Sequence, residues 1–147
     1  MRMLLLVTGS LGLAAPALAQ SKPAKPPLPV AIASAFHQSY PSATILAFSR
    51  EQEKGKTIWE VESKDGVTRR DLLYSPTGET LEIEETVPPA ELPAPVQSAW
   101  KAAAPGGTVT RAERVTRGSA VSYELSMKVG GKARSLSFDP SGKRVTP

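Results

Sequence analysis

The sequence contains no cysteine and only one histidine, His37. Without cysteine there is no disulfide, no thiolate metal site and no cysteine that could carry a lipid anchor after an export signal. A single histidine also excludes a histidine-rich metal site. The sequence has neither a glycine-rich phosphate loop nor a nucleophile elbow. We therefore expect no catalytic residue, no metal and no cofactor, and we predict that the chain is not an enzyme.

Long hydrophobic runs are also missing, apart from one near the N-terminus. Leu4 to Ala15 is largely apolar and follows Arg2, but it is shorter than the roughly 20 residues that a membrane-spanning helix needs. Ala17 to Ala19 forms a small-x-small cleavage site before Gln20. This pattern predicts a signal peptide over residues 1–19, with an uncleaved anchor as the alternative. After cleavage we expect a secreted chain without membrane insertion.

Aromatic residues are scarce, and the charge is divided unevenly along the chain. Residues 28–91 hold six basic and eleven acidic residues, a net −5, whereas residues 92–147 hold nine and three, a net +6. Nucleic-acid binders combine clustered basic residues with stacking aromatics, which the basic half lacks, so nucleic acid is not an expected partner. Opposite potentials attract. The two halves should therefore face each other within the chain or between chains, which predicts weak, salt-sensitive self-association.

What the sequence does contain is an internal repeat. Residues 28–83 align with residues 92–147 at a shift of 64 without a gap, with 14 identities in 56 positions. Several other positions keep their chemistry, such as Trp59 with Tyr123 and Tyr74 with Phe138. A fixed period of this length indicates a duplicated supersecondary unit.

Each copy begins with a helical pattern and continues with strand patterns. Ile32, Phe36 and their equivalents Val96 and Trp100 have the spacing of one helix face and should anchor the helix on a sheet. Strand patterns follow over 43–50 and 79–87 in the first copy and over 107–116 and 143–147 in the second, and between them each copy has a hairpin pattern, within 56–75 and 121–138. We expect an α+β fold of two tandem repeats, each with one helix followed by about four antiparallel strands. The short proline-rich connector favours side-by-side placement and leaves open whether the two repeats share one continuous sheet.

The turn signals set the expected hairpin registers. If Asp65 and Gly66 form a two-residue turn, Trp59 lies opposite Leu72 and Glu62 lies opposite Arg69. The same register in the second copy sets Tyr123 opposite Leu136 and Val121 opposite Phe138. The later turns, Ser75–Gly78 and Asp139–Gly142, carry proline and a glycine expected at positive φ.

The order of these motifs resembles a known family. A helix ending in YPSA, a WEVE or YELS strand, a glycine turn and a Y-x-P-x-G or F-x-P-x-G hairpin are similar to the beta-lactamase-inhibitor-like, PepSY-like family of secreted bacterial proteins. The resemblance implies PepSY-like repeats over 28–87 and 92–147. Proline-rich composition predicts a spacer at 20–27 and a linker at 88–91, because such segments cannot join a strand ladder. The resemblance also implies a periplasmic or secreted location, helices packed on one face of an antiparallel sheet with the opposite face open, and binding or inhibition in place of catalysis. The lactamase inhibitor itself has disulfides, which this chain lacks.

The candidate binding residues lie on the sheet face that should point away from the helices. In the first copy this face should carry Ile58, Glu60, Glu62, Arg69, Asp71 and Leu73, and in the second Ser122, Glu124, Ser126, Ser135 and Ser137. We select the following for recognition of a periplasmic protein or peptide, a secreted hydrolase included: Glu60, Glu62, Arg69, Asp71, Glu124 and Ser135. The alternative function is a structural or self-associating module of the cell envelope.

Other charged residues have simpler explanations. Glu79, Glu82, Glu84 and Glu85 fit no metal-binding loop and are interpreted as a solvated strand edge whose charge discourages edge pairing. Arg70 should cover the margin of the core with its stem while its head reaches a carboxylate. His37 has no equivalent in the second copy, where Lys101 replaces it, and is expected at the surface.

Overall fold

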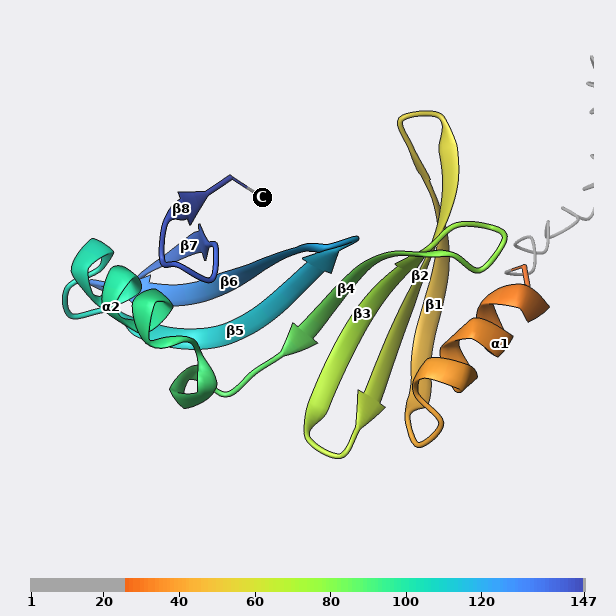
Figure 1. Cartoon of the computed structure of the whole chain (residues 1–147), viewed down its shortest axis with the longest axis horizontal. Coiled ribbons are helices and arrows are strands. Elements are labelled where there is room, and N and C mark those ends of the chain that lie inside the picture. Colours follow the sequence, from red (N-terminus) through yellow and green to blue (C-terminus); the bar gives the residue numbers. More distant parts are fainter. Residues whose placement is uncertain (1–25, 147) are drawn as a thin grey trace, which may run out of the picture.

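The computed structural model describes residues 26–146, which form a long twisted sheet with a helix toward each end (Figure 1). The elements in chain order are α1 (Val30–Ser39), β1 (Thr44–Glu53), β2 (Lys56–Asp65), β3 (Thr68–Tyr74), β4 (Thr80–Thr86), the 3₁₀ turn η1 (Pro89–Glu91), α2 (Ala94–Ala103), β5 (Thr108–Arg117), β6 (Ala120–Val129), β7 (Lys132–Phe138) and β8 (Arg144–Val145). The expected signal peptide, 1–19, and most of the spacer, 20–27, lie outside the described residues.

The expectation of two tandem units, each with one helix and about four strands, is wrong as a description of the fold. All eight strands belong to a single antiparallel sheet in the order β1 to β8, and the two helices are small additions to it. The sheet is continuous because β4 pairs with β5, with Ile83 opposite Thr116 and Thr86 opposite Glu113. These ladder hydrogen bonds satisfy backbone groups that two separate sheets would leave at exposed edges. We call this β4–β5 junction the seam.

Both helices begin after a proline and end before another. Pro29 and Pro93 immediately precede the first helical residues, where no backbone N–H is required. At the other end the backbone N–H of Tyr40 donates to the carbonyl of Phe36, and that of Ala104 donates to Trp100, just before Pro41 and Pro105. Each helix is therefore a short segment of defined length.

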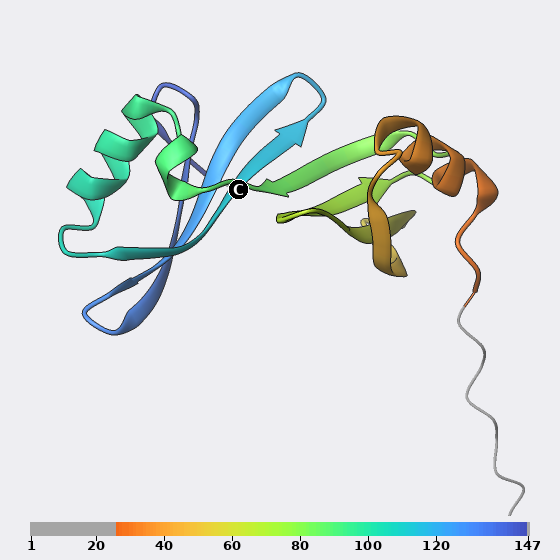
Figure 2. The same ribbon diagram turned by 90° about the horizontal axis from the view of Figure 1, so that it is seen from below.

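A separate hydrophobic cluster lies beneath each helix. Under α1, Ile32 and Phe36 are fully buried against sheet residues that include Trp59, Val61 and Leu72. Under α2, Val96 is fully buried with Leu125, Met127, Leu136 and Phe138, whereas Trp100 is only partly buried. Figures 1 and 2 both show α1 near the β1 end of the sheet and α2 in the other half of the molecule. Phe36 and Trp100, which the sequence predicts as equivalent helix anchors, thus differ in how deeply they are buried.

The predicted hairpin registers are wrong by two residues. Trp59 lies opposite Tyr74 and Glu62 opposite Asp71, because the turn residues are Gly66 and Val67 and not Asp65 and Gly66. The same shift places Tyr123 opposite Phe138. A shift of two keeps every side chain on its expected face, since strand side chains alternate with period two. The division into a helix face and an open face therefore holds.

The glycines of the later turns bring the sheet against the helices. Gly78 has φ +89°, and an added Cβ would lie 2.8 Å from the carbonyl oxygen of Ala31 in α1. Gly142 has φ +85°, and an added Cβ would lie 2.6 Å from the carbonyl oxygen of Pro95 in α2. Both positive φ and close backbone approach require glycine. These repeated glycines fix where each helix sits.

Candidate binding surface on the open sheet face

The open face is the sheet surface opposite the two helix clusters. Residues of β2 to β4 form continuous rows on it, with Glu60 opposite Leu73 and Leu73 opposite Glu82. The neighbouring row runs from Glu62 through Asp71 to Glu84 in the same way. Directly opposed residues on one face of a sheet lie within contact distance. The pairing therefore gathers carboxylates from three strands.

One hollow on this face has a volume of about 320 Å³. We call it the acidic pocket; its lining residues are Glu51, Gln52, Glu53, Ile58, Glu60, Asp71, Leu73, Glu82 and Glu84. Ile58 is 8% exposed and Leu73 is half-buried, so the pocket has an apolar part among the carboxylates. No lysine or arginine lines it.

A second hollow adjoins the acidic pocket and extends across the seam, with a volume of about 640 Å³. Its lining residues are Glu60, Glu62, Arg69, Asp71, Thr86, Thr110 and Arg111. Glu60 and Asp71 line both hollows. The four candidate binding residues of the first half therefore lie together on one surface.

The two candidates of the second half lie in a different environment. Ser135 donates a hydrogen bond of 3.0 Å to the Glu124 carboxylate, and their neighbours on this face are Ser122, Ser126 and Ser137. The Ser137 Oγ is buried and has no hydrogen-bond partner within the described part of the chain. Glu124 and Ser135 thus form their own pair and do not line either hollow.

Arginines of β5 reach across the seam to the acidic residues of the first half. Arg111 contacts Asp71 at 3.2 Å, and Arg117 contacts Glu82 at 2.6 Å through Nε and at 2.9 Å through its terminal nitrogen. Arg111 also contacts Glu113 at 2.5 Å. Some of the opposite charges of the two halves are therefore paired within the chain. Attraction between separate chains remains a prediction.

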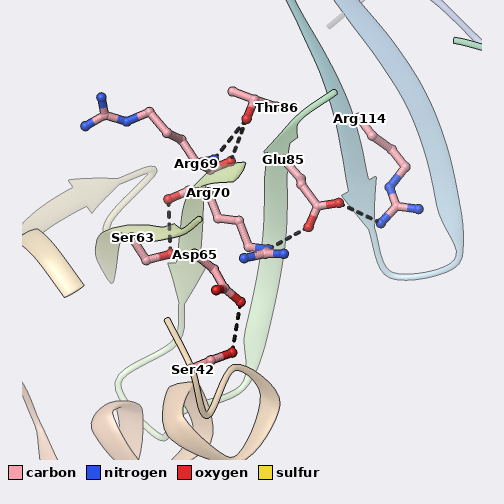
Figure 3. A network of polar contacts seen from close by, with 8 residues as sticks. All are labelled: Ser42, Ser63, Asp65, Arg69, Arg70, Glu85, Thr86 and Arg114. Carbon is pink, nitrogen blue, oxygen red and sulfur yellow. Dashed lines mark hydrogen bonds and ion pairs between the residues drawn. The ribbon is translucent and has the colours of Figure 1, made fainter. Parts of the chain in front are cut away.

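A third seam contact lies on the helix face (Figure 3). Arg70 donates from Nε to Glu85 at 2.6 Å, and Arg114 of β5 contacts the other Glu85 oxygen at 3.3 Å. The guanidinium of Arg70 also lies 4.7 Å from the centre of the Tyr40 ring, a cation–π distance. Arg70 is therefore a structural residue, as expected, and it connects α1 with the seam.

Glu84 is the carboxylate most affected by this environment. Its burial raises the pKa to about 7, and the hydrogen bond with Glu82 and the charges of Glu113, Glu82 and Glu124 act in the same direction. Burial also raises the pKa of Glu113, although Arg111 opposes that rise. Both effects follow from the cost of holding several carboxylates together out of water.

Asp71, Glu84 and Glu113 are the residues best placed to hold a cation. Each has a carboxylate oxygen within 4.8 Å of the others. However, the guanidinium of Arg111 already contacts both Asp71 and Glu113. That cation neutralises two of the three carboxylates, so the group is better described as a carboxylate–guanidinium network.

The interpretation of Glu79, Glu82, Glu84 and Glu85 as a strand edge is wrong. β4 is an internal strand that pairs with both β3 and β5, and Glu82 and Glu84 are half-buried on the open face. Glu85 points to the helix face and binds Arg70. The alternation of these residues in the sequence correctly indicates opposite faces, but strand order depends on pairing with β5, which no local signal reports.

Several functional candidates were missed for the same reason. Arg111 and Arg117 belong to the second half of the sequence but contribute to the open face of the first. His37 lies exposed on α1 beside Phe36, as expected for a surface position.

Comparison with known proteins gives a fold relationship. No protein-family profile and no curated protein matches the sequence. Among solved structures, a protein named as periplasmic from Bacteroides eggerthii has a TM-score of 0.70 and 17% identity, covering 82% of this chain and 88% of that chain. A DUF2874 family protein from Bacteroides uniformis has a TM-score of 0.67 and 14% identity, covering 80% and 86%.

A BLIP-like protein from Bacteroides fragilis has a TM-score of 0.64 and 18% identity, covering 82% of this chain and 84% of that chain. The chain shares its fold with these solved structures, one of which is named BLIP-like. The BLIP-like fold agrees with the family resemblance of the repeated motifs, and the periplasmic relative agrees with the expected periplasmic or secreted location. Neither described helix is long and apolar enough to cross a bilayer.

Proposed function

We propose that this chain is a non-catalytic periplasmic binding module that recognises a protein or peptide through its open sheet face. The observation that carries the proposal is the pair of adjoining hollows, which share Glu60 and Asp71 and are left uncovered by both helices. A broad, polar and partly apolar surface of this kind suits recognition by contact. The binding residues are Glu60, Glu62, Arg69 and Asp71, with Glu124 and Ser135 at the second-half end.

The chemistry of this surface favours binding over catalysis. A nucleophile needs a base within hydrogen-bond reach, and that base needs a third group to orient it. Surface hydroxyls do contact carboxylates, Ser49 with Glu60 at 3.2 Å and Ser135 with Glu124, but within the described residues neither carboxylate has a third group hydrogen-bonded to it that would orient it as a base. Occlusion of a secreted hydrolase is one form that such binding takes, and the BLIP-like neighbour supports testing it.

The proposal is tested by crosslinking from the open face. A photo-crosslinking amino acid at position 62, compared with one at the exposed α1 position Gln38, is expected to capture a periplasmic protein only from position 62. The captured protein is then purified and titrated against the mature chain. Glu62→Arg should weaken the complex about tenfold or more, while Gln38→Arg should leave it unchanged. Equal effects of the two variants would refute an open-face site.

A self-associating envelope module is the second candidate. It is favoured by β1, a ten-residue strand at the edge of the sheet, which could pair with a second copy. The excess charge not used at the seam would add a salt-sensitive attraction. Sedimentation velocity at low and high ionic strength distinguishes the two candidates, because self-association predicts a mass above the monomer that falls as salt is added.

A further inference from the structure

The acidic pocket carries more negative charge than the described residues neutralise. Six of its lining residues are carboxylates, and basic side chains of residues 26–146 reach only three of them. Arg111 contacts Asp71, Arg117 contacts Glu82, and the exposed Lys54 lies 3.8 Å from Glu53. The remaining three are Glu51, Glu60 and Glu84, for which the described residues provide no cationic partner.

The carboxylates without a cation lie beside an apolar surface. Ile58 and Leu73 line the same hollow, and Leu73 pairs directly with both Glu60 and Glu82 across the sheet. The ligand that fits this combination has an aliphatic stem and a positive head. Lysine and arginine side chains are built in this way, and they bury the stem while the head contacts carboxylates.

The second half shows that the fold does not require this chemistry. At the repeat-equivalent positions, Ser122 replaces Ile58 and Ser137 replaces Leu73. Ser135 likewise replaces Asp71. Yet the same strands form the same ladder in that half, with Glu124 opposite Ser137 as Glu60 is opposite Leu73. Ile58, Leu73 and Asp71 are therefore additions to a scaffold that forms without them, whereas Glu60 is kept in the second half as Glu124.

Glu84 makes the case for a missing positive charge stronger. Its pKa of about 7 reflects burial among carboxylates without a counter-ion. A cation placed next to it would favour its ionised form. The geometry alone, with Glu60, Glu82 and Glu84 around Leu73, already selects a positive ligand.

We propose that the acidic pocket receives a lysine or arginine side chain from a basic segment of the periplasmic protein partner. This inference rests on the proposed function and adds the chemistry of the partner. The stem lies on Ile58 and Leu73, and the head contacts Glu60 and Glu84. Electrostatic complementarity of this kind increases the association rate and selects basic partners.

The test uses the mature chain and short blocked peptides with one central lysine, arginine or norleucine. The methyl resonances of Ile58 and Leu73 should shift saturably with the lysine and arginine peptides, and the uncharged norleucine peptide should bind about tenfold more weakly. Combining Glu60→Gln with Glu84→Gln should weaken lysine-peptide binding about fivefold or more. Glu91→Gln removes one carboxylate at an exposed position in η1, outside the pocket; it is the control and should change nothing.

Several results would overturn the proposal. Equal binding of the three peptides, or equal binding by the double variant and Glu91→Gln, would show that the pocket does not select a positive side chain. Circular dichroism melting of each variant verifies that the fold is intact. If Lys22→Ala with Lys25→Ala shifts the Ile58 and Leu73 methyl resonances without any peptide, the chain's own N-terminal segment is the occupant and the partner assignment fails.

Measuring how the captured protein binds to two variants distinguishes this inference from the proposed function. If Glu62→Arg weakens the complex but the Glu60→Gln, Glu84→Gln double variant does not, the open face binds the partner without a basic side chain in the pocket. In that case the proposed function stands and the inference is wrong. If neither variant weakens the complex, both are wrong.

Discussion

The two halves of the molecule differ on the open face and agree on the helix face. On the helix face, Val61 corresponds to Leu125 and Leu72 is repeated as Leu136, and all four are buried. On the open face, the apolar Leu73 corresponds to the serine Ser137. Packing beneath a helix restricts substitution because interiors are dense, whereas an uncovered face accepts different chemistry. Under the proposed function, the helix face serves folding and the open face serves recognition.

Oppositely charged residues of the two halves form ion pairs across the seam. Arg111 and Arg117 bind the open-face carboxylates Asp71 and Glu82, while Arg114 binds Glu85 on the helix face. These pairs are partly exposed, so each stabilises the fold modestly. Their larger consequence is geometric, because they hold residues of the basic half at the border of the acidic pocket.

The largest predicted effect tests whether the two helix anchors are equivalent. Phe36 is fully buried and Trp100 only partly, so Phe36→Ala should lower the free energy of unfolding by about 3–5 kcal/mol and Trp100→Ala by clearly less. Urea denaturation of both variants measures the difference. Equal losses would mean that α1 and α2 contribute equally, contrary to the observed burial.

The second prediction concerns the glycines at the helix contacts. Gly78→Ala and Gly142→Ala should each cost about 2 kcal/mol, since the new Cβ would meet a helix carbonyl at a positive φ. Gly118→Ala is the matched control, because its φ is +58° but no atom lies within 4 Å of the added Cβ. The control should cost about 1 kcal/mol. Thermal unfolding that ranks Gly118→Ala as the most harmful would contradict a steric role for Gly78 and Gly142.

The third prediction compares the two faces of the seam. Glu85→Gln removes the charge shared by Arg114 across the seam and by Arg70, whose side chain is 13% exposed, and should cost about 1–3 kcal/mol. Glu82→Gln removes the partner of Arg117, whose side chain is 47% exposed, and should cost less than about 1 kcal/mol. Denaturant titration at low and high salt checks both values. A greater loss for Glu82→Gln would show that the open-face pair, and not the helix-face pair, fastens the seam.

The smallest effect is a pH dependence that arises from Glu84. Because its folded pKa of about 7 exceeds its unfolded value of 4.5, the folded state binds the proton more tightly. Stability should therefore fall as pH rises from about 4.5 to about 7, by about 1 kcal/mol after allowance for solvent screening. Glu84→Gln should remove this part of the dependence. An unchanged pH profile for Glu84→Gln would show that another group is responsible.

The sequence predicts the local elements better than their assembly. The helix stripe of Ile32 and Phe36 and the alternation around Trp59 identify elements and faces, because these signals depend only on neighbouring residues. The sequence leaves the continuous sheet open without deciding it, because β4 and β5 are separated by the proline-rich linker and α2. Turn placement at Gly66 failed for a related reason, since Asp65–Gly66 and Gly66–Val67 are both plausible glycine turns.

The same difference between local signals and long-range pairing applies to the candidate surface. Glu60, Glu62, Arg69 and Asp71 could be assigned to one face from alternation alone, and the structure brings them together. Glu84 was assigned to an edge because its burial depends on pairing with β5. Arg111 was missed because its contact with Asp71 joins residues 40 positions apart.

The most direct test of recognition through the open face is to map the captured partner on the folded chain. Amide and methyl NMR spectra of the mature chain, recorded with and without the purified partner, report every affected position at once. We predict perturbations centred on Ile58, Glu62 and Leu73, with the exposed residues of α1 and α2 unaffected. Perturbations confined to the helices, or to the β1 edge, would contradict the assignment of recognition to the open face.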